Sequence, residues 1–319
     1  MDFELSTDQE ALQEGIRNLC QGRFPMDTVR GLAETGGVDR GLWSVLAETG
    51  VFSLVLPEPD GVGLGWADAV LVFEELGRAA VPGPLVATFL AAGTVDGAAT
   101  GETVVGSVER GDGPVMIESF DQLDVLCVLD DAGVWRVDPA EVSCTPTGEP
   151  LDPLTPVHLA GSLPQGERIG EADTATAWRN RGAMLSAALQ LGLAEAALDS
   201  AVAYAKEREQ FGKPIGSFQA VKHMCADMLT LVEVARAAVY AAGVVTDDPE
   251  IDDPAKMASV AKITADHAAT QCGKHCIQVH GGMGYTWEVD AHLYLKRAWV
   301  LEQAFGDSDH HALLMADRL

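Results

Sequence analysis

The chain has few basic residues: 21 Lys and Arg stand against 48 Asp and Glu, which gives a formal net charge of -27 at pH 7. A surface that binds nucleic acid neutralises phosphates with an excess of Lys and Arg, so this balance argues strongly against nucleic acid as a partner. The same balance disfavours an anionic membrane surface. The remaining composition, with 47% hydrophobic and 22% charged residues, is ordinary for a globular protein.

The cysteines lack the spacing of a disulfide framework or of a zinc site. They are Cys20, Cys127, Cys144, Cys225, Cys272 and Cys276. Cys272, Cys276 and His280 fall at four-residue intervals, which would place them on one face of a helix as metal ligands. No second ligand pair accompanies them and small residues surround them, so buried core thiols are the better interpretation and we predict no metal site.

The amino-terminal sequence M-D-F-E-L-S-T-D-Q-E lacks the basic and apolar segments of a signal peptide. No apolar run is judged long enough to span a bilayer. We therefore expect a reduced, cytoplasmic protein without a membrane-spanning segment. At 319 residues the chain can bury a large core, divided among two or three subdomains.

The first region of the chain, residues 1–104, has the apolar spacing of amphipathic helices and is the first predicted domain. Ser6 or Thr7 is the expected cap of its first helix, with Glu10 placed to complete a capping box. A second helix is expected around residues 42–49 and ends in a glycine.

The rest of the chain divides into two further predicted domains. Residues 105–166 contain the short β-rich runs V-M-I-E, V-L-C-V-L-D and V-W-R-V-D, separated by Gly, Asp and Pro, and they predict a small β domain. Residues 167–319 return to helical spacing and predict a helical bundle. The fold class that follows is mainly α with a small β domain.

The segment Y-A-K-E-R-E-Q-F-G-K-P-I-G-S-F-Q, residues 204–219, separates two long predicted helices of the bundle. The first helix has an apolar face and should end near Phe211 and Gly212, because glycine accepts a left-handed turn and the proline that follows cannot continue a helix. The second helix should begin near Ser217, with that serine as its cap.

Arg208 is placed by this pattern in a last helical turn, beside exposed backbone groups. Together with Gln210 and Phe211 it provides groups that can bind a phosphate and the sugar or base attached to it. The alternative is a solvated charge that stabilises a helix end. The segment closely resembles the R-x-Q-F-G motif of acyl-CoA dehydrogenases, flavoproteins that desaturate acyl-CoA thioesters, and this resemblance favours the phosphate site.

Other segments are similar to that family in the same order along the chain. Phe3 to Ser6 resembles the start of the opening F-x-L-S-x-x-Q helix, residues 56–58 resemble a leucine-proline-glutamate loop, and residues 74–78 an E-E-L-G-R helix. In the bundle, Gln278 and the glycines of H-G-G-M-G-Y resemble the family's Q-x-x-G-G-x-G-Y/F element. Glycines there allow backbone to approach a ligand closely.

The resemblance implies that these motifs bind flavin adenine dinucleotide (FAD). In the family, a subunit contributes them to the pyrophosphate and adenosine of FAD across a dimer interface. The residues at the matching positions are Arg208, Gln210, Phe211, Phe218, Gln219, Gln278, Gly281 and Gly282.

The catalytic base of the family is missing from this sequence. Counting without gaps from the glycine element places Phe305 at the usual glutamate and Gly306 after it. Counting back from Arg208 places Gly182 at the glutamate position used by some members. Neither side chain can accept a proton. The family's T-E-P-x-A-G-S loop, which contacts the flavin ring, is also missing, and G-S-V-E-R-G-D-G-P stands in its place.

The chain therefore resembles the shortened, non-catalytic α subunit of the heteromeric α2β2 acyl-CoA dehydrogenases of bacterial sterol side-chain degradation. The resemblance implies a full-length catalytic β subunit as partner, an acyl-CoA substrate bound mainly through that partner, and electron-transfer flavoprotein as acceptor.

Two other readings of the sequence stay open. One is a homomeric dehydrogenase with a displaced base, for which Glu302, Asp307 and Asp309 are the nearby carboxylates. The other is a flavin-free scaffold on a degenerated enzyme fold. Retention of the adenosine-side residues argues against the scaffold, because a scaffold needs none of them.

Overall fold

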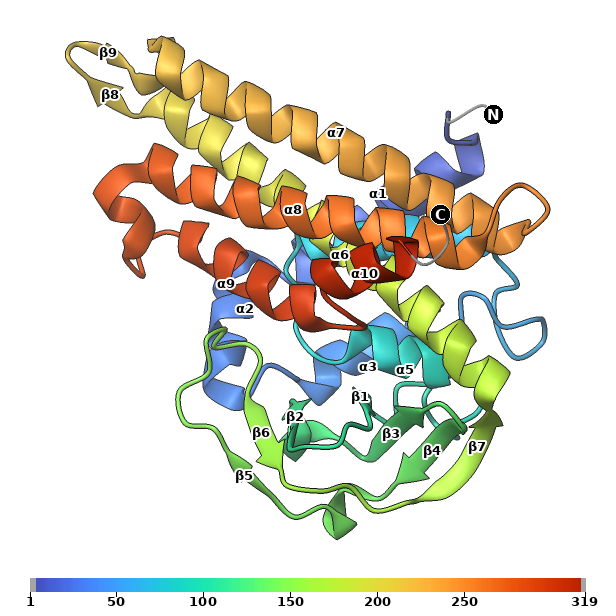
Figure 1. Cartoon of the computed structure of the whole chain (residues 1–319). Helices are drawn as coiled ribbons and strands as arrows, with labels where there is room; N and C mark the ends of the chain where they lie inside the picture. The colour runs from blue at the N-terminus through green and yellow to red at the C-terminus, as the bar shows by residue number, and fades with distance from the viewer. Residues whose placement is uncertain (1–3, 317–319) are drawn as a thin grey trace. The chain divides into compact units, whose positions relative to one another are not determined.

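The computed structural model describes residues 4–316 (Figure 1). Helices make up most of these residues, and short strands occupy the middle of the chain. The predicted fold class, mainly α with a small β part, is confirmed. Phe3, which belongs to the predicted match with the family's first helix, lies outside the described residues.

Contacts between residues divide the chain into two compact units. Unit 1 comprises Met1–Met26, Trp66–Val81 and Ala183–Leu319. Unit 2 comprises Asp27–Gly65 and Pro82–Gly182. Each unit therefore brings together segments that are far apart in the sequence.

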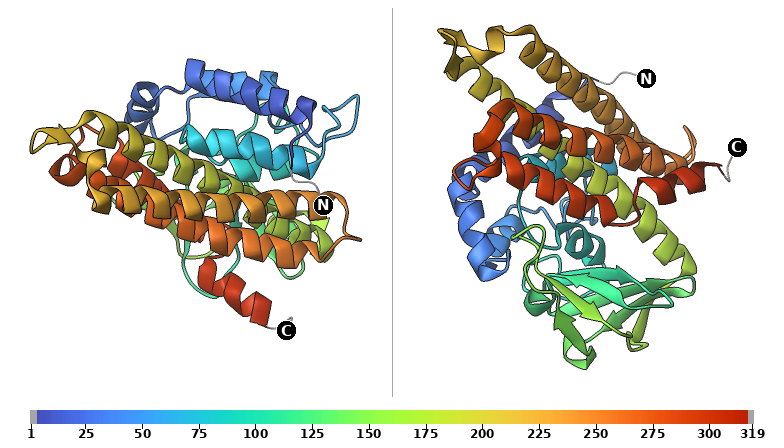
Figure 2. Two further views of the ribbon diagram at one scale, coloured as in Figure 1. Left: turned by 90° about the horizontal axis from the view of Figure 1, so that it is seen from above. Right: turned by 60° about the vertical axis from the view of Figure 1, so that its left-hand side comes forward.

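Unit 1 is a helical bundle in which α7 and α8 lie side by side (Figure 2). The long helix α6 enters it from unit 2. Its elements are α1 (Thr7–Arg23), α4 (Trp66–Arg78), α6 (Ala172–Glu207), β8 (Glu209–Gln210), β9 (Lys213–Pro214), η4 (Ile215–Ser217), α7 (Gln219–Asp247), α8 (Pro254–His280), η5 (Gly281–Tyr285), α9 (Ala291–Gln303) and α10 (Ser308–Ala316).

Helix α6 is the core helix of this bundle. All residues from 182 to 194 are buried, whatever their position around the helix. The prediction of a single apolar face is therefore wrong for this stretch, whereas Ala203, near the end of the helix, is exposed. A helix that is apolar on all sides is buried on all sides, and small residues such as alanine and glycine let its neighbours approach closely.

Two glycines allow α4 and α6 to pack backbone against backbone. A Cβ atom added to Gly77 would lie 2.1 Å from the carbonyl oxygen of Leu189. A Cβ atom added to Gly192 would lie 1.8 Å from the carbonyl oxygen of Glu74. The glycine of the E-E-L-G-R segment is therefore required by helix packing.

The two glutamates of that segment tie α1 and α7 to α4. Arg17 of α1 donates to Glu75 at 2.6 and 3.0 Å. Arg236 of α7 pairs with the buried Glu74, which also accepts from the Tyr240 hydroxyl at 2.7 Å. Buried carboxylates of this kind are tolerated because cations and donors surround them.

The start of α1 corrects the predicted capping box. Ser6 accepts from the backbone N–H of Gln9, and the Gln9 side chain accepts from the backbone N–H of Ser6. Because the helix begins at Thr7, its third residue is Gln9, so Gln9 and not Glu10 completes the box.

Unit 2 carries the sheets. The strands expected from the sequence are present as β2, β3 and β4, which confirms those three predictions. The elements of the unit are α2 (Met26–Leu32), η1 (Ala33–Thr35), α3 (Arg40–Glu48), α5 (Leu85–Ala91), β1 (Val105–Glu109), β2 (Val115–Glu118), η2 (Phe120–Gln122), β3 (Val125–Asp130), β4 (Gly133–Val137), η3 (Pro139–Glu141), β5 (Cys144–Pro146), β6 (Val157–Ala160) and β7 (Glu167–Glu171).

The strands form a four-stranded sheet in the order β1-β3-β4-β7 and a three-stranded sheet in the order β2-β6-β5. Strands β1 and β3 are parallel, with Val105 opposite Val125, and the other pairs are antiparallel. The central strand β3 is buried from Val125 to Leu129, as expected for a strand covered on both faces.

Helix α7 corrects the expectation about apolar runs. Among the described helices it is long and apolar enough to span a membrane by length and composition alone. It packs against α8 and α4 within unit 1, where 44% of its most apolar window is buried, and length and composition alone are weak evidence for a membrane span.

Candidate functional site

A short hairpin follows α6 and carries most of the predicted phosphate motif. Helix α6 ends at Glu207, and Arg208 is the first residue after it. Strands β8 and β9 then pair with Gln210 opposite Lys213. The predicted helix end near Phe211 and Gly212 is wrong by about one turn, because these two residues form the left-handed turn of the hairpin, with φ of 55° and 76°.

The start of α7 also differs from the prediction. The helix begins at Gln219, and the backbone of Phe218 occupies the cap position without a side-chain cap. Ser217 lies in a 3-10 turn before it. Gln219 is exposed, and Phe218 is half-buried.

Phe211 has both an exposed side chain and an unfavourable backbone conformation. Its side chain is 92% exposed, and its φ is left-handed although it carries a Cβ atom. Its ring packs edge-on against Phe218, with centroids 6.1 Å apart, and the Lys213 ammonium lies 4.4 Å from the centre of the Phe218 ring. Backbone strain of this kind costs about 1–3 kcal/mol and gathers at functional positions. The hairpin therefore presents a phenyl ring to solvent at a cost in folding free energy.

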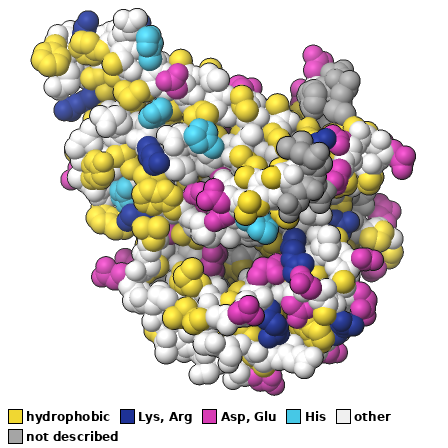
Figure 3. All heavy atoms as spheres, viewed as in Figure 1, with side chains coloured by type: hydrophobic (Ala, Val, Ile, Leu, Met, Phe, Trp, Pro, Cys, Tyr) yellow, Lys and Arg dark blue, Asp and Glu magenta, His cyan; other side chains and the backbone are white. Residues whose placement is uncertain are grey.

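Arg208 is exposed at the base of the same hairpin. Among the described residues, no hydrogen bond or ion pair engages its guanidinium. Glu207 and Glu209 flank it directly and are exposed, and Lys206, Lys213 and Lys222 are its basic neighbours in sequence. No acidic residue occurs between Gln210 and Asp227. Figure 3 shows Lys and Arg side chains beside hydrophobic ones where β8 and β9 lie. Basic side chains therefore outnumber carboxylates here, on an otherwise acidic chain.

The glycine element follows the end of α8. Gln278, Gly281 and Gly282 are exposed, and a Cβ atom on either glycine would meet no other atom within 4 Å. Gly281 has a φ of 62°, which favours glycine, and Gly284 is buried with its Cβ position 2.6 Å from the carbonyl oxygen of Ile277. Gly282 has neither a left-handed φ nor an atom of the described residues close to its Cβ position. Its lack of a side chain is explained if a ligand or a partner chain approaches there.

One stacking contact brings the two motifs to the same end of unit 1. The rings of Tyr204 and His280 are stacked, with centroids 4.2 Å apart and an angle of 25° between planes. The backbone carbonyl of Tyr204 accepts from the backbone N–H of Arg208 at 2.8 Å, and Gly281 directly follows His280. Arg208 and Gly281 therefore belong to one surface, which we call the adenosine-side surface together with Gln210, Phe211, Phe218, Gln219, Gln278 and Gly282.

Gln210 lies in β8, beside Arg208, and its side chain makes one local hydrogen bond. Its side-chain amide donates to the backbone carbonyl of Glu209 at 2.7 Å, and the side chain is exposed. Rotation about its side-chain torsions frees the amide at the loss of one exposed hydrogen bond, which contributes about 0.5–1.5 kcal/mol.

Cys272 and Cys276 are buried thiols, as predicted, and burial raises the pKa of each to about 12. His280 points its Nδ1 atom at the backbone carbonyl of Cys276, at 2.8 Å. A carbonyl oxygen only accepts, so Nδ1 carries the proton and donates. Within residues 4–316 no cluster of three or more His, Cys, Asp or Glu side chains is arranged to hold a metal ion.

The two family positions for a base carry no proton acceptor. Gly182 is buried within α6. Phe305 lies in the turn between α9 and α10, with a φ of 56°, and Gly306 follows with a φ of 96°. The carbonyl oxygen of Phe305 accepts from Nε2 of His311 at 3.1 Å.

The carboxylates that were considered as substitutes have other positions. Asp307 accepts the backbone N–H of His310 at 2.8 Å through Oδ1 and so caps α10. Asp309 is exposed, and Glu302 is half-buried in the last turn of α9. The cap explains Asp307 without a catalytic role.

Sequence reasoning missed a buried ion pair beside this turn. Lys262 and Asp266 of α8 are 0% and 1% exposed, and their side chains are 2.6 Å apart. Burial lowers the pKa of Lys262 and raises that of Asp266 to about 6, while their mutual attraction opposes both shifts. The signal in the sequence is a lysine and an aspartate four residues apart within a helix that otherwise consists of small residues.

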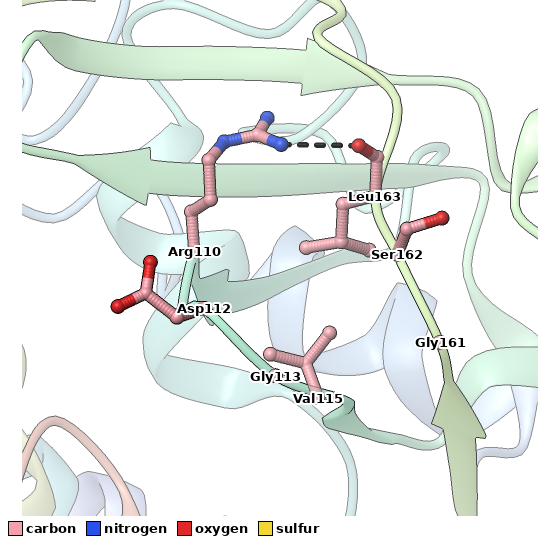
Figure 4. Close-up of a pocket in the computed structure, with 8 residues that line it drawn as sticks. Arg110, Asp112, Gly113, Val115, Gly161, Ser162 and Leu163 are labelled. Carbon is pink, nitrogen blue, oxygen red and sulfur yellow. Dashed lines mark hydrogen bonds between the residues drawn. The ribbon is translucent and has the colours of Figure 1, made fainter.

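Unit 2 contains the segment that stands in place of the flavin-ring loop. Arg110 spans a crevice there and donates to the carbonyl oxygens of Leu163 at 3.1 Å and Pro164 at 2.9 Å (Figure 4). It also pairs with Asp130 at 3.3 Å. The crevice has a volume of about 200 Å³. Its lining is Arg110, Gly111, Asp112, Gly113, Val115, Gly161, Ser162 and Leu163.

Comparison with known proteins matches both the amino-terminal and the carboxyl-terminal parts of the chain to domains of one family. The model of the acyl-CoA dehydrogenase amino-terminal domain matches residues 6–102, and that of the carboxyl-terminal domain matches residues 174–319. The chain is 34% identical to acyl-CoA dehydrogenase IpdE2 of Mycolicibacterium smegmatis over 318 residues, which cover 95% of this chain and 96% of that protein.

Solved structures share the fold. The ChsE4-ChsE5 complex from Mycobacterium tuberculosis contains a chain that matches with a TM-score of 0.85 and 23% identity, covering 100% of this chain and 98% of that one. A variant of the Tcur3481-Tcur3483 steroid ACAD matches with a TM-score of 0.83 and 24% identity, covering 97% of each chain.

Proposed function

Because the chain belongs to the acyl-CoA dehydrogenase family, we propose that it is the non-catalytic subunit of a heteromeric enzyme that introduces an α,β double bond into an acyl-CoA thioester. It contributes the ADP half of a shared FAD site. A full-length family member supplies the catalytic glutamate and the flavin-ring pocket. The observation that carries this proposal is the coexistence of an open adenosine-side surface with Phe305 and Gly182 at the two base positions.

The adenosine-side surface fits the ADP half of FAD in its donors and in its shape. The unpaired guanidinium of Arg208 forms strong, charge-assisted bonds with phosphate oxygens. The exposed backbone at Gly281 and Gly282 allows close approach, and Gln278 beside it brings an amide that both donates and accepts. Phe211 offers a ring face for stacking.

When bound, FAD supplies the hydride acceptor of the reaction. The residues of this chain bind and orient its ADP half. Proton abstraction is left to the partner, because a general base needs a lone pair and the Phe305 ring has none. This chain alone is then inactive in desaturation.

Unit 2 of this chain supports the division of labour. A crevice of about 200 Å³ is smaller than the roughly 300–1,000 Å³ of sites that enclose drug-sized ligands. Arg110 has its donors engaged by two carbonyl oxygens and a carboxylate across this crevice. We assign the flavin ring to the partner because this chain has G-S-V-E-R-G-D-G-P where the family has its flavin-ring loop.

The similarities support the partner and the substrate class that we propose. ChsE4-ChsE5 is named as a complex, and the Tcur3481-Tcur3483 protein is named a steroid ACAD. By analogy we propose that this chain belongs to an α2β2 assembly that acts on a sterol-derived acyl-CoA. We further propose that the assembly works in the cytoplasm, that electron-transfer flavoprotein is its electron acceptor, and that it binds neither nucleic acid nor a membrane. The three-domain division at 1–104, 105–166 and 167–319 is part of the same proposal.

The test is to purify the chain alone and together with a full-length homologue encoded beside it, and to measure flavin absorbance and subunit ratio. We expect a colourless chain alone and a yellow complex with equal numbers of the two subunits. A yellow homo-oligomer that acyl-CoA bleaches would contradict the proposal and favour a displaced base. A stable complex without flavin would favour a scaffold.

A further inference from the structure

The turn between α9 and α10 is held from one side by a buried cation. The ammonium group of Lys262 donates to the carboxylate of Asp266 at 2.6 Å and to the backbone carbonyls of Leu301 at 3.2 Å and Glu302 at 2.8 Å. Both carbonyls belong to the last turn of α9, where backbone acceptors have no partner within the helix. A cation also stabilises the negative end of the helix dipole.

The ion pair is itself fixed from a third helix. The side-chain amide of Gln190 in α6 donates to Asp266 at 3.1 Å and to the carbonyl of Ala298 at 2.8 Å. Each of these side chains is fully or almost fully buried. A buried charge is retained at low cost only when its hydrogen-bonding groups are used in this way. The end of α9 is therefore fastened to α8 and α6 by polar contacts.

The same turn is held from its other side by a histidine. Nε2 of His311 in α10 donates to the carbonyl of Phe305 at 3.1 Å. Nδ1 of His311 lies 3.0 Å from the hydroxyl oxygen of Ser259, whose proton is donated to the backbone carbonyl of Ala255, also 3.0 Å away. Ser259 lies three residues before Lys262 on α8, so one helix anchors both sides of the turn.

Between these two anchors the backbone is strained. Phe305 and Gly306 both have left-handed φ values, 56° and 96°. Phenylalanine has no local reason to adopt this conformation, which persists only where the surroundings impose it. The anchors at Lys262 and His311 are the surroundings that impose it.

We propose that Lys262 is a positioning residue, which together with His311 holds residue 305 in its left-handed conformation independently of the side chain at that position. The frame of a base-bearing turn then persists in this chain, and catalysis was lost by the change of one side chain within it together with the loss of the flavin-ring loop. This inference rests on the proposed function only in taking residue 305 as the former base position.

The first test removes the pair without leaving a lone buried charge. In the full chain, Lys262→Met with Asp266→Leu replaces two charged side chains by apolar ones of similar size. We expect amide hydrogen exchange in residues 304–311 to become at least tenfold faster, while exchange in α7 stays unchanged. The matched control is Lys256→Met with Asp252→Leu, which removes an exposed pair at the start of α8 and should leave residues 304–311 unchanged.

The second test separates an imposed conformation from simple packing of the phenyl ring. Phe305→Ala and Phe305→Glu should both keep the slow exchange of residues 304–311, because the anchors are backbone contacts. Fast exchange in Phe305→Ala would show that the ring holds the turn and would overturn the inference. So would unchanged exchange in a folded Lys262→Met, Asp266→Leu variant. None of these measurements involves flavin. The inference can therefore fail while the proposed function stands, and the proposed function can fail while the inference stands.

Discussion

The adenosine-side surface and the turn around Phe305 lie in the same helical unit, yet they differ in how their polar groups are used. On the surface, the Arg208 guanidinium has no partner among the described residues, Phe211 is 92% exposed, and Gly282 faces open space. In the turn, Lys262, Asp266 and His311 are buried and hydrogen-bonded. The Arg208 guanidinium is thus open to an external molecule, whereas the charged groups at the turn bond to other residues of the chain, although Oε1 of the neighbouring Gln190 has no partner among the described residues.

The comparison also bears on how an enzyme subunit loses its reaction. A base can be lost through one side chain, whereas a surface for a phosphate depends on several residues and on backbone shape. If residue 305 is the former base position, as we propose, the turn keeps its left-handed backbone without the base. On that proposal, the backbone frame has outlasted the chemistry.

The largest effect is expected from breaking the buried pair on one side. Lys262→Met leaves Asp266 buried without its cation, and we expect the free energy of unfolding to fall by about 3–5 kcal/mol. Urea denaturation of the full chain measures this. Lys256→Met, which removes an exposed cation from the same helix, should cost less than about 1 kcal/mol. Equal effects of the two substitutions would remove the contrast between the turn and exposed positions.

The next effect concerns the surface. Arg208→Ala removes a charge-assisted phosphate contact, and we expect FAD affinity of the complex to fall by about 1.5–3 kcal/mol, roughly tenfold to a hundredfold. Flavin absorbance after gel filtration at rising salt measures it. Stability should change little, because no described residue pairs with this side chain. Lys256→Ala is the control, and full flavin occupancy in Arg208→Ala would refute the assignment.

Two glycines of one element provide a matched pair. Gly284→Ala places a Cβ atom 2.6 Å from the Ile277 carbonyl oxygen and should destabilise the chain by about 1–3 kcal/mol. Gly282→Ala meets no atom of the chain and should change stability by less than about 0.5 kcal/mol, while it lowers flavin occupancy of the complex. Urea denaturation and flavin absorbance separate the two. If Gly282→Ala leaves occupancy intact, the open glycine has no role in binding.

The last effect is a pH dependence at the turn. Burial lowers the pKa of His311 to about 4, with Lys262 and His310 acting in the same direction and the Phe305 carbonyl and Asp307 against it. Between pH 6.5 and 4 the unfolded chain binds a proton that the folded chain does not, so this group makes stability fall as pH falls.

His311→Gln lacks that contribution. Its unfolding midpoint should therefore fall less than that of the unchanged chain on acidification from pH 6.5 to 4, as thermal unfolding at several pH values would show. An identical slope in the two proteins would mean that His311 takes up its proton equally in the folded and unfolded chains.

Residue patterns predicted the fold class and the β-rich runs because both depend on local periodicity. They also predicted a turn at Phe211 and Gly212. They failed by one turn on where α6 ends, because the pairing of β8 with β9 competes with helix for the residues after Glu207. The predicted cap at Ser217 failed for a related reason, since those residues form a 3-10 turn.

The candidate site was predictable in its members and not in its geometry. A motif names Arg208 and Gly281, which are 73 positions apart, but their place on one surface depends on the stacking of Tyr204 on His280. Asp307 shows that a residue chosen from the sequence as a candidate can have a different role in the structure. The sequence offers it as a carboxylate near the base position, and the structure shows it capping α10.

The sequence by itself determined which motif residues this chain carries: Arg208 and the glycines of its second motif are present, and Phe305 and Gly182 stand at the two positions that the resemblance assigns to a base. Those are properties of side chains at fixed positions and need no coordinates. Only the tertiary structure decided that Lys262 and His311 clamp the turn at Phe305. Hydrogen bonds between α6, α8, α9 and α10 join residues up to 108 positions apart, as with Gln190 and Ala298, and such contacts have no periodicity from which they could be predicted.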